Sequence, residues 1–179
     1  MKRKTALFSS ILVLLLALGV VPAFAGPPDR DSIVDVALAV NSETGEFSIL
    51  IAALQAADPS VLATLDGRGQ FTVFAPTDEA FAAAAADLNL TLDQLLALLV
   101  ANPDYLTDVL LYHVAPGRRD STDVIASERI RTLQRGFLMQ DGGILTDNLG
   151  REVGIVAVDI EADNGIIHVL NNVVLPYLP

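Results

Sequence analysis

The hydrophobic pattern of this chain changes at Gly117, and this change leaves few folds open to it. From residue 32 to residue 116, apolar residues recur at helical spacing, with a short β-rich run at Phe71–Phe74. After Gly117, alternating or continuous β-branched runs are separated by turn formers such as Asp141-Gly142-Gly143. Strands this close together leave no room for the long crossovers of parallel neighbours, so they must pair antiparallel. The sequence therefore predicts an α+β fold, with a helical N-terminal part packed on an antiparallel C-terminal sheet system.

Capping signals place the starts of the predicted helices. Asp58 precedes Pro59, a residue favoured at the first helical position, and Thr77 precedes two acids that suit the positive end of a helix. The run from Thr91 to Gln94 matches a capping box. We predict helices over Ser32–Val40, over Glu46–Ala57, from Asp58 to Gly67, after Thr77, after Thr91, and from Asn102 towards His113. The predicted strands of the C-terminal part are Ile130–Leu133, Phe137–Gln140, Ile144–Thr146, Val153–Ile160, Ile166–Leu170 and Val173–Leu175.

Residues 1–25 have the organisation of an export signal peptide. Lys2–Lys4 are all basic, Ile11–Leu18 is the centre of an apolar segment, and Ala23–Ala25 gives a small-residue cleavage pattern. The alternative is an uncleaved membrane anchor, but the apolar stretch from 6 to 21 is shorter than the about 20 residues that a span needs. We expect cleavage after Ala25, no stable membrane insertion afterwards, and a secreted protein, extracellular or periplasmic. A short segment, 26–30, would then precede a single domain over 31–178.

Charge and cysteine content exclude several classes of function. The chain carries 22 acidic residues against 11 Lys and Arg, a net charge of −11, and loss of the three basic residues of the signal would make it −14. So acidic a protein is a poor ligand for nucleic acid or anionic lipid, because both are polyanions. The chain has no cysteine, which rules out disulfides, thiolate catalysis and cysteine-based metal sites.

Several catalytic-looking motifs fail on inspection, so we predict a protein that is not an enzyme and has no catalytic, cofactor-binding or metal residues. Asp159, Glu161 and Asp163 resemble the start of a calcium loop, but the glycine is displaced by one position and the last ligand position is Leu170. A strand end and a turn with solvated acids explain these residues better. Gly67-Arg68-Gly69 has no third glycine and runs from helix into strand, the reverse of a dinucleotide-binding loop.

Three stretches, in this order and spacing, carry a family resemblance. They are residues 71–81, FTVFAPTDEAF; residues 110–117, LLYHVAPG; and residues 159–170, DIEADNGIIHVL, continuing to residue 176. Together they resemble the two homology boxes and the Tyr-His box of the fasciclin domain, over about residues 31–176. The resemblance implies a wedge of two antiparallel β-sheets, with about seven strands and with helices packed around them. The motif residues that it marks as structural are Phe74, Pro76, Thr77, Asp78, Tyr112, His113, Asp159, Asn164, Gly165 and His168.

The same resemblance implies a secreted, non-enzymatic module for adhesion or cell-surface interaction, with a cell-surface or matrix protein or a glycan as its partner. The alternative is an extracellular carrier that binds a lipid or pigment in an apolar groove of the wedge. A large apolar pocket would distinguish the carrier from the adhesion module. The chain contains no Arg-Gly-Asp sequence, so integrin binding is not carried over.

Arginine is concentrated in one segment of an otherwise acidic chain, between residues 118 and 151. One interpretation is that these arginines pair with neighbouring acids on a solvated face, and the other is a patch that contacts an acidic glycan or partner. Arg129 and Arg131 lie two apart at the start of a predicted strand and should share one face. Arg118 and Arg119 lie in the preceding loop, where binding groups are common. These four arginines form the candidate interaction patch.

The two histidines are predicted to be structural rather than catalytic. His168 alternates with apolar residues on one strand face, as a core histidine bonded to the backbone would. His113 ends a predicted helix, where a partial positive charge would suit the negative end of the helix dipole. We also expect Phe74, Tyr112 and the strand Ile166–Leu170 to share one core, because such apolar runs need burial.

Overall fold

The computed structural model describes residues 31–178, so the expected signal, 1–25, and the segment 26–30 lie outside the described residues. Along the chain, helices surround one early strand, and a run of strands with one short helix follows. The helices are α1 (Ile33–Thr44), α2 (Ser48–Ala56), α3 (Pro59–Leu65), α4 (Asp78–Asp87), α5 (Leu92–Ala101), α6 (Pro103–Tyr112) and α7 (Ser121–Ile125). The strands are β1 (Phe71–Pro76), β2 (Val114–Pro116), β3 (Arg129–Arg131), β4 (Phe137–Asp141), β5 (Ile144–Thr146), β6 (Glu152–Ala162) and β7 (Gly165–Leu170).

The helix starts predicted from Asp58, Thr77 and Thr91 are confirmed, because these side chains accept hydrogen bonds from N–H groups of the first turn. Helix α2 begins at Ser48 rather than at Glu46, and the Asn102 side chain makes no cap bond at α6. The Ser32 hydroxyl accepts from the N–H of Asp35, whose carboxylate accepts from the N–H of Ser32, so α1 begins with a complete capping box. Thr91 and Gln94 form the same box at α5, and Thr77 caps α4. Each cap satisfies N–H groups that the helix itself leaves without a partner. These starts are therefore encoded locally.

The strands are hydrogen-bonded in the order β2-β1-β7-β6-β5-β4-β3. The predicted α+β wedge is confirmed, and the neighbouring C-terminal strands pair antiparallel as expected. β1 and β7 instead pair in parallel, with Phe74 opposite His168. The expectation of purely antiparallel sheets is wrong for this pair, because the long segment between β1 and β7 supplies the crossover that parallel strands need.

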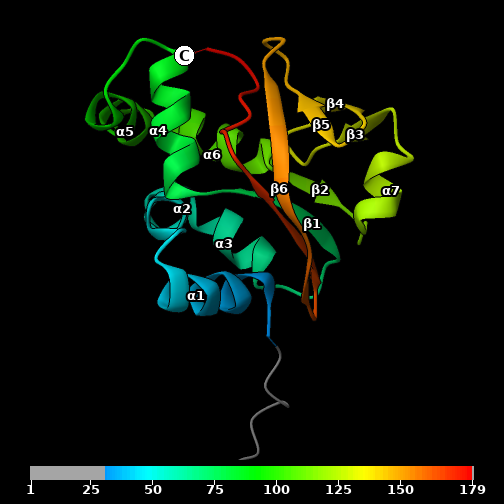
Figure 1. Cartoon of the computed structure of the whole chain (residues 1–179). Coiled ribbons are helices and arrows are strands. Elements are labelled where there is room, and N and C mark those ends of the chain that lie inside the picture. Colours follow the sequence, from blue (N-terminus) through cyan, green and yellow to red (C-terminus); the bar gives the residue numbers. More distant parts are fainter. Residues whose placement is uncertain (1–30, 179) are drawn as a thin grey trace, which may run out of the picture.

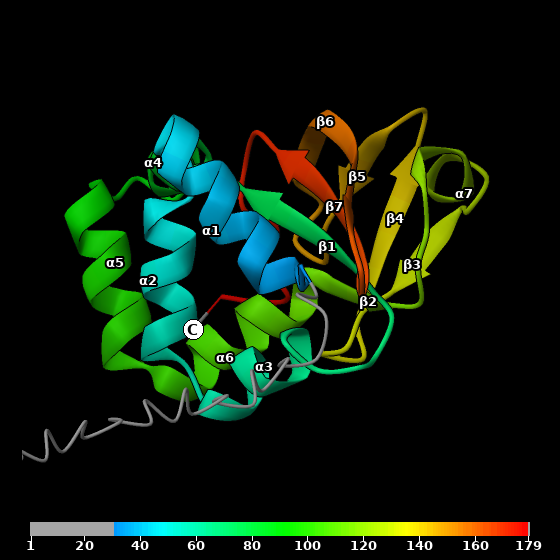
Figure 2. The same ribbon diagram turned by 90° about the horizontal axis from the view of Figure 1, so that it is seen from below.

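Strand β6 joins the two halves of the wedge. Its first residues, Glu152–Gly154, pair with β5, and the rest of the strand pairs with β7 through two register shifts. Helices α1–α6 lie on one side of the β1–β7 pair, while β3–β5 and α7 lie on the other (Figure 1; Figure 2). In residues 31–178 no single helix is long and apolar enough to cross a membrane. Only the pair α4 and α5 has the required length and hydropathy when taken together, and the two helices are bent by 93° relative to each other.

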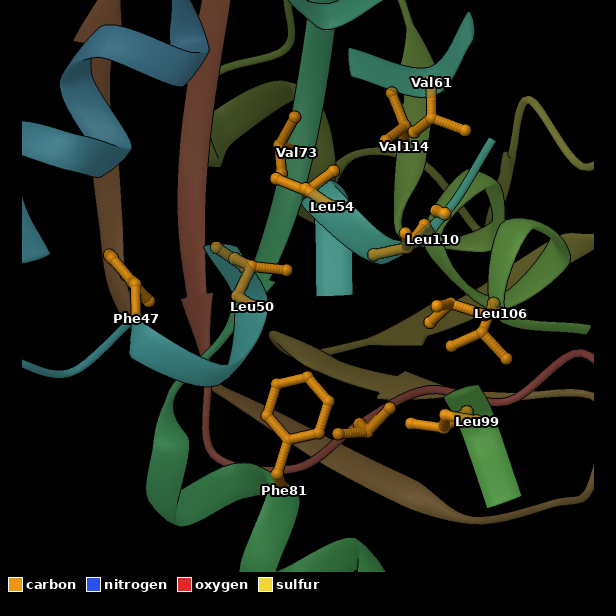
Figure 3. Close-up of a cluster of buried hydrophobic side chains, with 14 of the residues drawn as sticks. Phe47, Leu50, Leu54, Val61, Val73, Phe81, Leu99, Leu106, Leu110 and Val114 are labelled. Atoms are coloured by element: carbon orange, nitrogen blue, oxygen red, sulfur yellow. The ribbon is translucent and has the colours of Figure 1, made fainter. Parts of the chain in front are cut away.

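Strand β1 separates two hydrophobic clusters, because alternate residues of a strand point to opposite faces. Val73 and Ala75 face the larger cluster, between the sheet and helices α1–α6. Figure 3 shows this cluster, in which Leu50 and Leu54 of α2 lie near Val73 of β1. Phe74 faces the smaller cluster, which the strands enclose. The helical layer and the strands of the second half are therefore both packed on the β1–β7 pair.

The expectation that the three motif stretches share a core is confirmed in part. Phe74, Tyr112 and Leu170 are all fully buried in the smaller cluster. Ile167 and Val169 of the same strand belong to the larger cluster. Strand β7 is buried on both faces, as is typical of a strand that has a parallel neighbour and cover on each side.

The predicted strand Val173–Leu175 is wrong, because this segment bonds to side chains rather than to a neighbouring strand. The N–H of Val174 donates to Nε2 of His113 at 3.2 Å, and the N–H of Leu175 donates to Oδ2 of Asp147 at 3.0 Å. The backbone oxygen of Val173 accepts from Arg151 at 2.8 Å. Buried backbone groups must be paired, and side chains do this here. We call residues 173–177 the C-terminal strap.

Candidate functional site

The motif residues lie at separate places where distant segments of the chain are hydrogen-bonded together. His168 is at the centre of one of them. It lies on β7, fully buried, with its ring centroid 5.6 Å from that of Phe74. Its Nε2 donates to the backbone oxygen of Arg119 at 3.0 Å, and its Nδ1 accepts from the N–H of Asp159 at 3.3 Å. Backbone groups therefore satisfy both ring nitrogens, as expected for a core histidine.

Asp159 connects β6 to the start of α7. It has a φ of +60° at a register shift of β6, a conformation that Asp tolerates better than bulky residues. Its carboxylate oxygens accept from the N–H and the hydroxyl of Ser121 at 2.7 and 2.6 Å. Glu161 faces Arg118 instead, so the calcium-like run is divided among different partners. Within residues 31–178, no group of three His, Cys, Asp or Glu is placed to hold a metal ion.

Asn164 and Gly165 form the turn between β6 and β7 and join it to the helical part. The Asn164 Oδ1 accepts from the N–H of Ile33 at 2.7 Å, and its Nδ2 donates to two backbone oxygens at the end of α3, at 2.6 and 2.9 Å. Gly165 passes so close to β1 that a Cβ atom would lie 2.1 Å from the backbone oxygen of Phe71. This turn therefore holds α1, α3 and β1 together.

Thr77 and Asp78 follow Pro76, the last residue of β1, and attach α4 to α2. The Thr77 side chain caps α4. The Asp78 Oδ1 accepts from the N–H of Ile49, in the first turn of α2, at 2.8 Å. The N–H of Asp78 donates to the backbone oxygen of Glu46 at 2.7 Å. The carboxylate thus lies at the positive ends of two helices, which stabilises its charge.

Tyr112 ends α6 inside the smaller cluster and holds two loops. Its hydroxyl donates to the backbone oxygen of Phe137 at 2.6 Å and accepts from the N–H of Asn148 at 3.1 Å. Burial raises the pKa of Tyr112 to about 12, so the hydroxyl keeps its proton at physiological pH. The residue is a structural link between α6, β4 and the turn after β5.

His113 holds the C-terminal strap in its neutral form. Its Nδ1 donates to the backbone oxygen of Val109 at 2.7 Å, which leaves Nε2 to accept from Val174. Burial lowers the pKa of His113 to about 4. The predicted positive charge at this helix end is therefore wrong, because the cost of burying an imidazolium outweighs the attraction of the helix dipole.

The four arginines of the candidate patch do not all present free guanidinium groups. Arg118 donates to two backbone oxygens beside the β6–β7 turn, at 2.8 and 3.0 Å, and lies 3.5 Å from Glu161. Arg119 is half-buried, and its guanidinium donates to a serine of the loop after α7 at 3.3 Å. Arg129 and Arg131 are both exposed on the same side of β3, as the two-residue spacing indicates. Within residues 31–178, these last two are the arginines of the patch whose guanidinium groups form no hydrogen bond or ion pair.

Arg129 and Arg131 lie on an exposed surface that also carries large apolar side chains. Arg131 is opposite Phe137 and Arg129 is opposite Met139 in the β3–β4 ladder. The Arg129 guanidinium lies 4.9 Å from the centroid of the Phe137 ring, a cation–π contact. Phe137 is 38%, Met139 49% and Ile144, on β5, 45% exposed. We call these five residues the outer face.

Sequence reasoning found the two arginines of the outer face but missed Phe137, Met139 and Ile144. A signal was present, because Phe137 and Met139 alternate with Leu138 and Gln140, which are buried. Both sets contain a large apolar residue, however, so the alternation alone does not show which side of the strand meets the core. The packing of α7 and the neighbouring strands on one side leaves the other side exposed.

Two grooves lie on the helical side of the wedge. The larger has a volume of about 840 Å³ and lies among the end of α1, the start of α4, and β6 with β7. We call it the acidic groove, after its charged lining residues Glu46, Asp78 and Glu79; its apolar lining includes Val40, Phe47, Val156, Ala157, Ile160 and Val169. The smaller groove, about 260 Å³, lies among α2, α5 and α6 and has mainly apolar walls, which include Ile49, Ala53, Leu96 and Val100.

Comparisons with known proteins agree with this architecture. A family model described as Fasciclin domain matches residues 45–176. Protein sll1483 of Synechocystis sp. is 38% identical over 143 residues, which are 79% of this chain and 72% of that protein. Transforming growth factor-beta-induced protein ig-h3 of Sus scrofa is 34% identical over 149 residues, 83% of this chain and 20% of that protein. A FAS1 domain pair from the insect cell adhesion molecule Fasciclin I is similar in fold, with a TM-score of 0.57 at 16% identity, over 74% of this chain and 46% of that one.

Proposed function

Because this chain belongs to the fasciclin domain family, we propose that it is an exported, non-enzymatic adhesion module that binds a cell-surface or matrix partner through its outer face. Fasciclin I, which shares the fold, is an insect cell adhesion molecule, and this supports an adhesive role. The chain spans only 20% of the length of the pig protein that it resembles. The contacts of that larger protein are therefore no guide to which partner this single domain binds.

The observation that carries this proposal is the composition of the outer face. Exposed Phe, Met and Ile side chains lie beside two arginines that make no ion pair within residues 31–178. Arginine, methionine and aromatic residues are enriched in protein interfaces, and a few such anchors supply most of the binding energy. The chain as a whole is strongly acidic, so an acidic partner needs a local group of arginines such as this one to offset the overall repulsion.

The non-enzymatic part of the proposal is supported by the use of the polar motif residues. The ring nitrogens of His113 and His168 form hydrogen bonds with backbone groups, and the Asp159 carboxylate accepts hydrogen bonds from Ser121. Catalysis needs a nucleophile or base within hydrogen-bond reach of a bound substrate. These groups instead face buried backbone, and they lie in different places in the fold.

The test is binding of the mature protein to an immobilised acidic polysaccharide at 0.1 M and 1 M salt, between which the screening length falls from about 10 Å to about 3 Å. We expect binding to weaken with salt and to be lost in the double variant Arg129→Glu, Arg131→Glu. Phe137→Ala should also weaken it, because the aromatic anchor is removed. Salt-insensitive binding, or full binding by the double variant, would contradict the proposal.

A matched control separates the outer face from net charge. Arg131→Glu and Arg68→Glu change the charge equally, but Arg68 lies in the loop between α3 and β1, which is not part of the strands β3–β5 that carry the outer face. We expect Arg68→Glu to bind as the wild type does. Equal losses in the two single variants would show that bulk charge, rather than the outer face, controls binding.

A carrier of a lipid or pigment is the second candidate function, and the volume of the acidic groove favours it. At about 840 Å³, the groove lies in the size range of small-molecule sites. Binding of a neutral lipid probe that the outer-face variants retain would support the carrier. The acids in the groove wall weigh against it, because a neutral ligand would cover carboxylates without pairing them.

Export is the remaining part of the proposal, and it rests on the order of basic, apolar and small residues before Gly26. N-terminal sequencing of protein recovered outside the cytoplasm should begin at Gly26. Protein that retains Met1 in the membrane fraction would show that the segment is an anchor.

A further inference from the structure

We propose that the acidic groove is a second binding surface, and that it takes a segment of a partner protein in which basic side chains neighbour aliphatic ones. This surface is distinct from the outer face, and the inference does not depend on what the outer face binds. It rests on the sign of every charge in the groove, the fixed position of the acidic wall, and the exposed apolar floor.

All the charged residues that line the groove are acids. Glu46 lies in the loop before α2, and Asp78 and Glu79 lie in the first turn of α4. Within residues 31–178, none of the three forms an ion pair, and no arginine lines the groove. Two helix N-termini stabilise the Asp78 carboxylate, but no cationic side chain among the described residues neutralises any of the three acids. A cation that entered the groove would meet carboxylates of one sign only.

The acidic wall is held in place before any partner binds. The backbone of Asp78 bonds to that of Glu46 at 2.7 Å, and the Asp78 Oδ1 accepts from the N–H of Ile49. The loop before α2 and the start of α4 are thus tied together, and Glu46 and Glu79 project from a fixed frame. Little conformational entropy is lost when a partner binds to this fixed wall, which improves affinity for a given set of contacts.

The floor of the groove is apolar and partly open to solvent. Val156 of β6 is 59% exposed, and Ile160 and Val169 line the same space. The register shifts of β6 fall at Ala157, in the middle of this floor. Val169 itself is buried, so Val156 is the exposed valine of the floor. An exposed apolar side chain rimmed by charged residues suits an interaction site, because a partner that covers it removes apolar surface from water.

Charge and size together select the occupant. Acidic glycans and anionic lipid head groups are repelled by three carboxylates. A small amine could pair with one acid, but it would leave most of a groove of about 840 Å³ uncovered. A polypeptide segment can place a Lys or Arg against Glu46 or Glu79 while neighbouring aliphatic side chains cover Val156. Such a segment would pair the charges of the acidic wall and also cover the apolar surface of the floor.

The test uses a labelled short peptide of alternating Lys and Val, with two comparison peptides in which Glu or Ser replaces each Lys. Binding to the mature protein is measured by fluorescence anisotropy, and the site is located by backbone amide shifts. We expect the Lys peptide to bind and to shift residues 45–47, 77–79 and 156–160. The double variant Glu46→Gln, Glu79→Gln should weaken binding about five- to tenfold, as expected for two partly exposed ion pairs.

The matched control is Asp93→Asn, Asp104→Asn, which removes the same charge from exposed positions at the starts of α5 and α6. It should bind as the wild type does. Val156→Lys places a resident cation at the exposed floor and should abolish binding, and unchanged thermal unfolding would show that each variant is folded. Unchanged binding by the groove variant, equal binding of the Glu peptide, or amide shifts elsewhere would each overturn the proposal.

Two other occupants have distinct outcomes. If a neutral lipid probe binds, is displaced by the Lys peptide and shifts the same residues more strongly, the groove is a carrier site and the proposal is wrong. If the protein self-associates with rising concentration in sedimentation, and both Glu46→Gln and Arg131→Glu abolish this, the occupant is a second copy of the chain. Either result would replace the partner segment as the ligand.

Discussion

Replacing Asp147 with Asn tests whether a buried ion pair holds the C-terminal strap. Asp147 follows β5 and is 4% exposed. Its Oδ2 accepts from Arg151 Nη2 at 2.6 Å, from Arg151 Nε at 3.0 Å and from the N–H of Leu175 at 3.0 Å. Its Oδ1 accepts from the backbone N–H groups of Leu149 and Arg151. One carboxylate therefore fixes both the β5–β6 turn and the strap.

The expected loss follows from the burial of this pair. Asn keeps the shape of the side chain but removes the charge, which leaves the Arg151 guanidinium in the interior without its counter-charge. Breaking a buried pair in this way costs about 3–5 kcal/mol. Arg118 and Glu161 provide the contrast within the same molecule, because their side chains are 36% and 77% exposed. Removing the Glu161 charge should cost at most about 1 kcal/mol.

The assay is equilibrium urea unfolding of the mature protein, with Asp147→Asn compared against Glu161→Gln. The dependence of the unfolding free energy on urea should be unchanged, so the midpoint reports stability. Adding Arg151→Met to Asp147→Asn should recover part of the loss, because no unpaired charge then stays buried. A loss below about 1 kcal/mol for Asp147→Asn, or equal losses for the two acids, would show that this buried pair does not hold the C-terminal strap.

Three further predictions concern the core. His113 has a pKa of about 4 in the folded protein, against an ordinary value of 6.5, so the unfolded chain binds more protons between these two pH values. Stability should be complete above pH 6.5 and fall by about 3 kcal/mol towards pH 4. His113→Gln should flatten this dependence in urea midpoints measured across that range, and an unaltered slope would assign it to other groups. Phe74→Ala should cost about 3–5 kcal/mol through lost apolar transfer and a cavity, and an unchanged urea midpoint would exclude Phe74 from the core. Gly165→Ala should cost more than about 3 kcal/mol, because its Cβ would meet a backbone atom. The control Gly154→Ala should cost less in thermal unfolding, because its Cβ would meet only the movable side chain of Asn171; equal losses would show that the approach to β1 is not the cause.

Elements whose bonding partners are close in the chain can be predicted from residue type and spacing. The starts of α1, α4 and α5 depend on Ser32, Thr77 and Thr91, each of which bonds to an N–H three residues later. The β4–β5 hairpin depends on Gly142 and Gly143, which both have positive φ. Because these interactions are complete within one turn of chain, residue type and spacing are sufficient to predict them.

The candidate site is predicted less completely than the fold. Sequence motifs identify His168, Asp159 and Asn164 as structural positions, but their partners lie on other elements, up to 131 residues away in the case of Asn164. Of the four predicted arginines, two bond within the protein, and the exposed apolar residues beside the other two were missed. Which guanidinium groups stay free depends on neighbours that no local pattern specifies.

Features that join distant segments depend on tertiary packing and cannot be predicted from local patterns. The residues at 173–175 have the β-branched character of a strand, but His113 and Asp147 occupy their backbone groups. Strand β1 lies between β2 and β7, and it is parallel to β7 because the long crossover between them permits that pairing. The acidic groove combines Glu46 with Val156, and the outer face combines three strands. These surfaces exist only after packing has chosen which side of each strand is buried, and that choice is made by burial of apolar area over the whole domain.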